Sequence, residues 1–290
     1  MGNIIDLIGN TPMVEIKGFH DNPDVKIFAK LEGNNPGGSV KDRAALNMIR
    51  SAMERGDIDQ NSKLIEATSG NTGIALAMIA SIYGLEIELV MPSSSTRERT
   101  LTMEAFGGKV TLLDNMEASR DYAEEKAAGG DYYILNQFSN PDNYEAHVKT
   151  TGPEIWRDTE GKITHFVSAM GTTGTIMGCS IFLKDQNPEV QIVGCQPTEN
   201  SSIPGIRRWP KAYLPKIFDP TRVDRVIDID QEDATLRARQ LARKEGVFAG
   251  MSSGGAFHAA LEVANEIDSG VIVFIVCDRG DRYLSSDLFG

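Results

Sequence analysis

Short hydrophobic runs of the kind that form β-strands alternate with helical stretches along the chain. Strands alternating with helices are typical of parallel sheets that are covered by helices on both faces. Two such series, one in each half of the chain, predict two α/β lobes with a ligand site between them. The predicted strands are 63–67, 85–91, 109–113, 132–138, 164–170, 190–195, 224–229 and 270–277.

The helical stretches carry their own start and stop signals. Ser39 is a good N-cap and Asp42 completes a capping-box pattern before a helix that Gly56 ends. A second capping box, with Glu98, predicts a helix that begins near Ser95. Further helices are predicted at 72–83, at 117–128, from the glycine-rich turn 171–175 to about 186, at 232–245 and after residue 252.

Lys41 does not fit its place in this pattern. It lies in the first turn of the helix after Ser39, beside the positive end of the helix dipole. A charged ammonium there costs up to about 1 kcal/mol. A lysine that is neutral, or bound to something, escapes this cost, and such local conflicts are typical of functional sites. The alternative is a solvated lysine whose stem covers apolar surface.

Composition narrows the class of protein. The chain has 290 residues, of which 41% are hydrophobic and 24% charged, as in ordinary globular proteins. Its net charge of −12 argues against nucleic acid and against anionic membrane surfaces as partners. The longest apolar run, 271–276, is far too short to span a bilayer.

The ends and the cysteines indicate a cytoplasmic location. No basic region precedes the apolar residues at the N-terminus, so we expect no signal peptide, and Asp6 breaks the myristoylation pattern. The cysteines are odd in number and far apart, which fits a reducing compartment. The histidines show no metal-ligand spacing, so we expect no metal.

Three glycine-rich turns carry candidate chemistry. "GTTGT" (171–175) follows an apolar strand and opens a helix, where backbone N–H groups, the helix dipole and hydroxyls attract an anion. Its spacing is neither a Rossmann fingerprint nor a Walker A loop. "TSGNTG" (68–73) repeats the design and suits a carboxylate, and "SSGGA" (252–256) opens a third helix. Taken singly, each turn also fits an ordinary strand-to-helix connection or helix cap.

Together with Lys41, these turns specify a ligand that has a phosphate, binds near a carboxylate and bonds an amine. Pyridoxal phosphate, held by Lys41 as a Schiff base, meets that description. An imine-forming lysine needs a low pKa, and the positive end of the helix destabilises the ammonium form.

The motifs resemble the cysteine synthase family of fold-type II pyridoxal-phosphate enzymes, which is related to the tryptophan synthase β subunit. The resemblance runs from "IGNTP" (8–12) through "NNPGGSVKDRAA", "EATSGNTGIALA", "GTTGT" and "SSGGA" to "RGDRYLS" (279–285). Within the family, "SSIPGIRRWP" (201–210) and "CDRGDRYLS" (277–285) are most similar to the B isoforms.

The resemblance implies roles for individual residues. Lys41 would hold the cofactor and then act as the acid–base, Asn71 would bond the ring oxygen, and Ser252 would face the pyridine nitrogen. The cofactor phosphate would be bound by Gly171, Thr172, Thr173, Gly174 and Thr175. The substrate carboxylate would be bound by Thr68, Ser69, Thr72 and Gln137, and an anionic sulfur donor by Arg207 and Arg208.

The implied reaction is a β-replacement. O-Acetyl-L-serine would lose acetate to give an α-aminoacrylate, which sulfide or thiosulfate would attack to give L-cysteine or S-sulfocysteine. Ser252, being a hydroxyl, does not force protonation of the ring, which favours β-elimination. The sequence leaves the sulfur donor open, as well as the range of amino-acid substrates and any complex with serine acetyltransferase, which the B isoform is not expected to form.

The resemblance also implies the architecture: two three-layer α/β/α lobes with mainly parallel sheets in a homodimer. Residues 1–12 and 35–144 would form a smaller mobile lobe, and residues 13–34 and 145–290 a larger one. The chain ends at Gly290, early for the family, so we expect part of a C-terminal helix or tail to be missing.

Some alternatives stay open at this stage. The segment "IRRWP" also fits a basic surface loop in which Trp209 is a packing anchor, and Cys277 fits packing better than nucleophilic chemistry. A cystathionine β-synthase-like activity would use the same cofactor geometry, although the short chain disfavours it. A catalytically silent paralogue is disfavoured by the intact Lys41 and Asn71.

Overall fold

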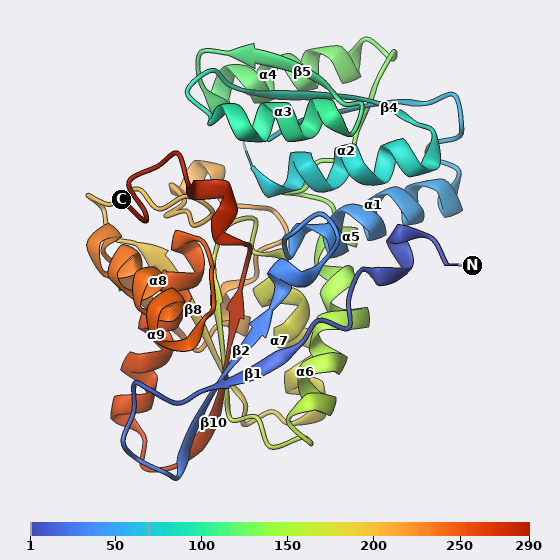
Figure 1. Ribbon diagram of the computed structural model, residues 1–290. Helices are drawn as coiled ribbons and strands as arrows, with labels where there is room; N and C mark the ends of the chain where they lie inside the picture. Colours follow the sequence, from blue (N-terminus) through green and yellow to red (C-terminus); the bar gives the residue numbers. More distant parts are fainter. Residues whose placement is uncertain (1, 69) are drawn as a thin grey trace.

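The chain forms two β-sheets, each covered by helices (Figure 1). The computed structural model describes residues 2–68 and 70–290. The six-stranded sheet contains, in spatial order, β1 (Met13–Ile16), β2 (Val25–Leu31), β10 (Gly270–Val276), β7 (His165–Ala169), β8 (Gln191–Pro197) and β9 (Arg225–Ile229). The four-stranded sheet contains β5 (Lys109–Leu113), β4 (Glu86–Pro92), β3 (Lys63–Ala67) and β6 (Tyr133–Ile134).

Both sheets are mainly parallel, as predicted; β1 runs antiparallel to β2. The first two strands join the strands of the second half of the chain, while the strands between residues 63 and 134 form the smaller sheet. The chain therefore leaves the larger sheet after β2, builds the smaller one and returns. The helices between and after the strands are α1 (Lys41–Arg55), α2 (Asn71–Tyr83), α3 (Arg97–Ala105), α4 (Met116–Ala128), α5 (Asp142–Ala146), α6 (Gly152–Asp158), α7 (Gly174–Gln186), α8 (Gln231–Glu245) and α9 (Met251–Glu266).

The strand β10 shows why the larger sheet needs helices on both faces. Its side chains alternate: Ile272 and Phe274 pack in the core formed with α8 and α9, whereas Val273 and Ile275 pack in the core formed with α6 and α7. A strand that is buried on both sides reads as a continuous apolar run, which is what the sequence has there.

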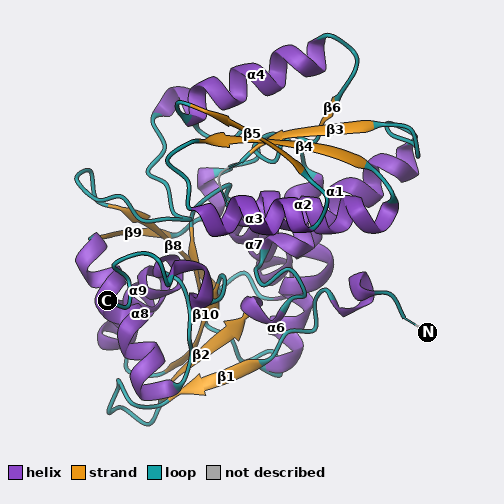
Figure 2. Ribbon diagram, turned by 45° about the horizontal axis from the view of Figure 1, so that its top comes forward, coloured by secondary structure: helices purple, strands orange, loops and turns teal. Residues whose placement is uncertain are grey.

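The smaller sheet has the same three layers. Leu64 and Leu89 pack in the core formed with α1 and α2, whereas Ile65 and Val90 pack against α4 on the opposite face. Figure 2 shows α4 on one side of this sheet and α1, α2 and α3 on the other. The predicted pair of three-layer α/β/α lobes is therefore confirmed.

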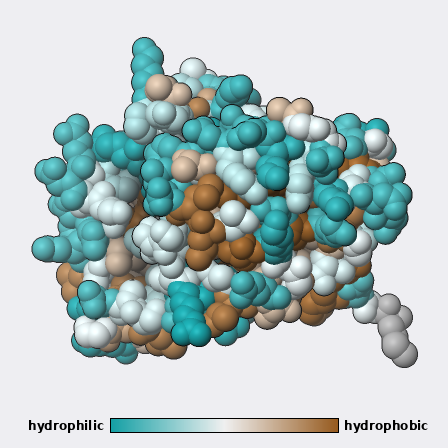
Figure 3. Space-filling view, turned by 90° about the horizontal axis from the view of Figure 1, so that it is seen from above, coloured by the Kyte–Doolittle hydropathy of each residue, from teal (hydrophilic) through white to brown (hydrophobic). Residues whose placement is uncertain are grey.

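The outer face of the smaller lobe is largely polar. Seen from above, it carries hydrophilic side chains around a short hydrophobic stripe (Figure 3). Leu101 of α3 and Leu112 of β5 are among the half-exposed apolar side chains of this part of the chain. Scattered exposure of this kind is normal for a globular surface.

Three local predictions were wrong in detail. The helix after Ser39 begins at Lys41, and Asp42 accepts a hydrogen bond from the Gly37 N–H instead of closing a capping box. The helix expected near Ser95 is present and begins at Arg97, but its N-cap is Thr96, without a side-chain cap bond, instead of a capping box with Glu98. The strand expected over 132–138 has only two residues, because Asn136 adopts a positive φ of 53° that turns the chain away from the sheet.

We expect Gly254→Ala to destabilise the fold because α8 and α9 pack closely there. A Cβ at Gly254 would lie 2.0 Å from the Ala234 carbonyl oxygen, which is backbone and has no room to move. The free energy of unfolding, measured in urea, should fall by roughly 1–3 kcal/mol. The matched control is Gly255→Ala, whose Cβ would meet the flexible end of Ile206 at 3.0 Å and should be nearly neutral. Equal losses in both variants would contradict this explanation.

Candidate active site

The candidate residues lie where strands end and helices begin. Lys41 is the first residue of α1, Asn71 the first of α2 and Gly174 the first of α7, while Ser252 is the second residue of α9. In sheets of this type, ligands bind at the carboxyl ends of the strands. The last turn after β10 connects these helix ends, because Asp278 bonds Asn71 and the Cys277 N–H donates to Ser253.

The pKa of Lys41 is lowered, as expected, but the cause is burial and not the helix dipole. Desolvation lowers the pKa of its amine, and the nearby Cys277 and Asp278 only partly oppose this. Its backbone N–H donates to the Ser39 hydroxyl at 3.2 Å. An amine whose pKa is lowered is more often uncharged, which is the form that condenses with an aldehyde.

The turn 171–175 forms a tight cradle at the N-terminus of α7. Thr173 adopts the left-handed conformation with φ 71°, and its buried hydroxyl oxygen has no hydrogen-bond partner among the described residues. A Cβ at Gly174 would lie 2.0 Å from Asn143 Oδ1, and one at Gly171 would lie 2.8 Å from the Gly205 carbonyl oxygen, so only glycine fits at both positions. An unpartnered hydroxyl at a helix N-terminus fits a phosphate group.

Two further side chains support this cradle. Asn143 Nδ2 donates to the Thr172 hydroxyl at 3.2 Å, and His147 Nε2 lies 3.4 Å from the Thr175 hydroxyl. Burial holds the pKa of His147 well below its usual value, so its ring is neutral. Both belong to the segment of α5 and the π-helix η3 (His147–Thr151), which the sequence did not single out.

The turn 68–73 places the hydroxyls of Thr68 and Thr72 near the start of α2. Thr68 and Thr72 are buried, and the Thr72 hydroxyl donates to Gln137 Oε1 at 2.7 Å. Ser69, the fourth residue expected to bind the substrate carboxylate, lies outside the described residues. The structure therefore brings Thr72 and Gln137 together from distant parts of the chain.

The segment after β10 contributes a polar cluster that the sequence reasoning missed. Asn71 Nδ2 donates to Asp278 Oδ2 at 2.7 Å, and the Tyr283 hydroxyl donates to the same oxygen at 2.6 Å. Arg282 donates to Asn71 Oδ1 and to the Gly37 carbonyl oxygen. These residues belong to "CDRGDRYLS" (277–285), where several charged residues directly follow a buried strand. That pattern is the sequence signal that indicates a site here.

Ser252 and Cys277 face each other across this turn. Ser252 is buried, and a Cβ at Gly205 would lie 3.3 Å from its hydroxyl oxygen. Burial raises the pKa of Cys277 to about 11, so the thiol stays protonated. A protonated thiol is a poor nucleophile, which agrees with a packing role for Cys277.

The two arginines of the 207–209 segment have different environments. Arg207 is exposed, whereas Arg208 donates to the Pro197 carbonyl oxygen at 2.8 Å and forms an ion pair with Asp228. Trp209 Nε1 donates to the Gly171 carbonyl oxygen at 2.7 Å, and its ring packs edge-on against Phe138. The segment is therefore attached directly to the cradle.

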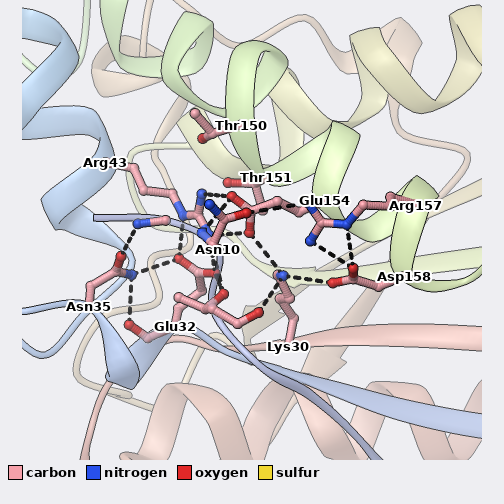
Figure 4. A network of polar contacts seen from close by, with 12 residues as sticks. Asn10, Lys30, Glu32, Asn35, Arg43, Thr150, Thr151, Glu154, Arg157 and Asp158 are labelled. Atoms are coloured by element: carbon pink, nitrogen blue, oxygen red, sulfur yellow. Dashed lines mark hydrogen bonds and ion pairs between the residues drawn. The ribbon is translucent and has the colours of Figure 1, made fainter. Parts of the chain in front are cut away.

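A buried ionic network surrounds Arg43, two residues beyond Lys41 in the sequence (Figure 4). Arg43 donates to Glu32 at 2.6 and 2.8 Å and to Glu154 at 2.6 and 2.7 Å. Lys30, fully buried in β2, bonds Glu154 at 2.9 Å and the Thr11 carbonyl oxygen at 2.7 Å. The network joins α1 to β2 and α6, and so fixes the helix that carries Lys41 to the larger sheet.

Within residues 2–68 and 70–290, no cluster of His, Cys, Asp and Glu side chains is arranged to hold a metal ion. The same part of the chain contains no helix that is long and apolar enough to cross a membrane.

Comparison with known proteins shows which family the chain belongs to. Residues 4–278 match the family model described as pyridoxal-phosphate dependent enzyme. Cysteine synthase B of Pseudomonas aeruginosa is 56% identical over 99% of this chain and 97% of its own length, and cysteine synthase B of Escherichia coli is 54% identical over 100% and 97%. The crystal structure of a cysteine synthase from Entamoeba histolytica superposes with a TM-score of 0.94 at 36% identity, covering 100% of this chain and 90% of that one.

The chain belongs to the cysteine synthase family of pyridoxal-phosphate-dependent enzymes. The expected fold type and the expected cofactor are thereby confirmed. The glycines of the cradle and the unpartnered Thr173 hydroxyl fit the cofactor phosphate, and the amine of Lys41 fits its aldehyde. The roles of the individual residues stay predictions.

We expect Glu154→Gln to lower stability in a pH-dependent way. Burial alone would raise the pKa of Glu154, but the hydrogen bonds and charges of Arg43 and Lys30 lower it to about 2. A carboxylate with a lowered pKa stabilises the fold fully above its ordinary value of 4.5, and this stabilisation is lost as the pH falls toward 2. The variant should lose roughly 3 kcal/mol in urea unfolding at pH 7, and less at pH 3.

The control for this prediction is Glu160→Gln, which changes an exposed carboxylate just after the same helix. It should leave the urea midpoint almost unchanged at both pH values. A Glu154→Gln loss that is the same at pH 7 and pH 3 would show that packing, and not charge, is what the substitution removes.

Proposed function

We propose that this enzyme makes L-cysteine from O-acetyl-L-serine and sulfide by β-replacement. The observation that carries the proposal is the position of Lys41: an amine with a lowered pKa stands at a helix N-terminus, in a site whose other helix ends suit a phosphate and a carboxylate. Cysteine synthases B at 54–56% identity over the whole chain support the same reaction. When bound, pyridoxal phosphate supplies the electron sink that makes the α-proton of the amino acid acidic.

The residues of the chain divide the work as follows. Lys41 holds the cofactor at rest, takes the α-proton of O-acetylserine so that acetate leaves, and returns a proton to the α-carbon after sulfide has bonded to the β-carbon. Asn71 orients the cofactor ring by bonding the ring oxygen, and Ser252 is an uncharged partner for the ring nitrogen. The turn 171–175 binds the phosphate.

Thr68, Thr72 and Gln137 hold the substrate carboxylate. Their hydroxyl and amide donors lie at the start of α2 and on the loop after β6, and Thr72 and Gln137 are already in contact. Within the smaller lobe, residues 1–12 and 35–144, movement of the part beyond α1 toward the larger lobe, residues 13–34 and 145–290, would bring these donors onto the substrate and exclude water. We further propose that the enzyme is a cytoplasmic homodimer.

The finer proposal concerns the sulfur donor. Arg207 is exposed on a segment that Trp209 ties to the cradle, so a cation is available beside the site for an anionic nucleophile. Thiosulfate, a dianion, gains more from this charge than hydrosulfide does. The product with thiosulfate would be S-sulfocysteine.

Replacing Lys41 tests the proposed reaction. Lys41→Ala should lose the imine-type absorbance of the purified holoenzyme and at least about a thousandfold of its turnover of O-acetylserine with sulfide. Lys63→Ala, an exposed lysine on β3, should retain both. Borohydride reduction followed by digestion should give the cofactor adduct on the peptide that contains Lys41, and an adduct on another peptide would overturn the assignment.

Single-turnover kinetics test the role of the arginines. The enzyme is loaded with O-acetylserine and then mixed with sulfide or thiosulfate. Arg207→Ala should slow the thiosulfate reaction about tenfold more than the sulfide reaction, because one charge at the site is lost. Arg208→Ala should act less, because its guanidinium is bound to Asp228. Arg222→Ala serves as the control, and unchanged thiosulfate rates in both variants would refute the role of this segment.

A further inference from the structure

Glu66 is a buried carboxylate that the proposed mechanism does not use. It lies near the end of β3 and is only 2% exposed. Its oxygens accept hydrogen bonds from two consecutive backbone N–H groups, those of Asn136 at 2.9 Å and Gln137 at 3.1 Å. Glu66 therefore fixes the backbone of the loop that carries Gln137, at a distance of 70 residues along the chain.

We propose that Glu66 is a positioning residue for substrate binding, which holds the amide of Gln137 where it meets the substrate carboxylate. The inference rests on the proposed function, since it takes Gln137 to be a ligand of that carboxylate. It goes further because Glu66 itself does not touch the substrate.

Gln137 is held from three directions. Glu66 accepts from its backbone N–H, Asn143 Nδ2 donates to its carbonyl oxygen at 2.6 Å, and the Thr72 hydroxyl donates to its side-chain Oε1 at 2.7 Å. The last bond orients the side-chain amide so that Nε2 is the end that can donate to a carboxylate. Asn143 also bonds Thr172, so the position of Gln137 is coupled to the phosphate cradle.

The backbone at Asn136 shows why this loop needs an anchor. Asn136 has a φ of 53°, in the left-handed region that residues other than glycine adopt only where contacts enforce it. Its N–H is one of the two that Glu66 binds. Without the carboxylate, the turn from β6 into Gln137 would relax toward a more common conformation, and the side-chain amide would move with it.

The surroundings of Glu66 differ from those of a carboxylate that only stabilises the sheet. Burial raises the pKa of Glu66 to about 7, opposed by the two N–H donors and by the charge of Arg120 on α4. Glu88, on the adjacent strand and also 2% exposed, instead binds the side chains of Lys109, Thr111 and Tyr132. Glu88 thus joins elements of the smaller lobe to one another, whereas Glu66 binds the loop that enters the site.

A double-mutant cycle on the holoenzyme tests the proposal. Glu66→Gln removes the acidic group and replaces one acceptor oxygen by a donor; it should raise KM for O-acetylserine about tenfold while kcat changes less than about threefold. In a Gln137→Ala background, the same substitution should have almost no further effect on KM, because Glu66 acts through Gln137. Glu88→Gln is the matched control and should leave KM unchanged in both backgrounds.

Several outcomes would overturn the proposal. If Glu66→Gln lowers only the melting temperature, like Glu88→Gln, or if its effect on KM is fully additive with Gln137→Ala, Glu66 is structural. If Glu66→Gln does not yield folded holoenzyme, the cycle is decided with Glu66→Asp, which keeps the charge but does not reach both N–H groups. Two measurements separate this proposal from the proposed function. If the wild type fails to turn over O-acetylserine, the proposed function is refuted. If calorimetry shows that the Glu66 variants bind L-cysteine as tightly as the wild type does, the positioning role of Glu66 is refuted.

Discussion

The buried ionic network around Arg43 is the interaction on which the site depends. α1 carries Lys41 at its first position and packs on the smaller sheet, while the loop 171–175 belongs to the larger sheet. Arg43, two residues beyond Lys41, is bound on both sides by Glu32 and Glu154, which come from the larger sheet and its helix α6. Buried ions cost so much desolvation that such a network is stable only when every partner is present. The amine is thereby held at a fixed place relative to the cradle.

The chain combines a conspicuously acidic composition with a site that attracts anions. Its net charge is −12, yet the substrate carboxylate, the cofactor phosphate and the sulfur donor are all negative. In the proposed site, helix N-termini and hydroxyls supply the positive potential for the phosphate and the carboxylate, and Arg207 supplies a charge for the sulfur donor. The ammonium form of Lys41 is disfavoured separately, by burial of the amine.

Much of this was predictable from the sequence, for physical reasons. The strand and helix order followed from apolar runs and glycine-rich turns, and most predicted elements lie within a few residues of the observed ones. The sequence predicted a lowered pKa for Lys41 from the helix dipole, whereas the cause in the structure is burial of the amine. What the sequence did not reveal depends on contacts between distant residues: the partners of Arg43, the support of the cradle by Asn143, and Asp278 beside Asn71. The shortened β6 was missed because Asn136 adopts a positive φ, and the N–H of this residue binds Glu66, which lies 70 residues away along the chain.

The hydrogen bond from the Trp209 indole to the Gly171 carbonyl oxygen has a consequence for how such enzymes diverge. This bond joins the segment that we propose faces the incoming nucleophile to the turn that we propose binds the cofactor phosphate, so a change in one segment also affects the other. A graft of this segment from a relative with another nucleophile would need the residues around Gly171 to be transplanted with it. Otherwise the graft would change the specificity and at the same time weaken cofactor binding.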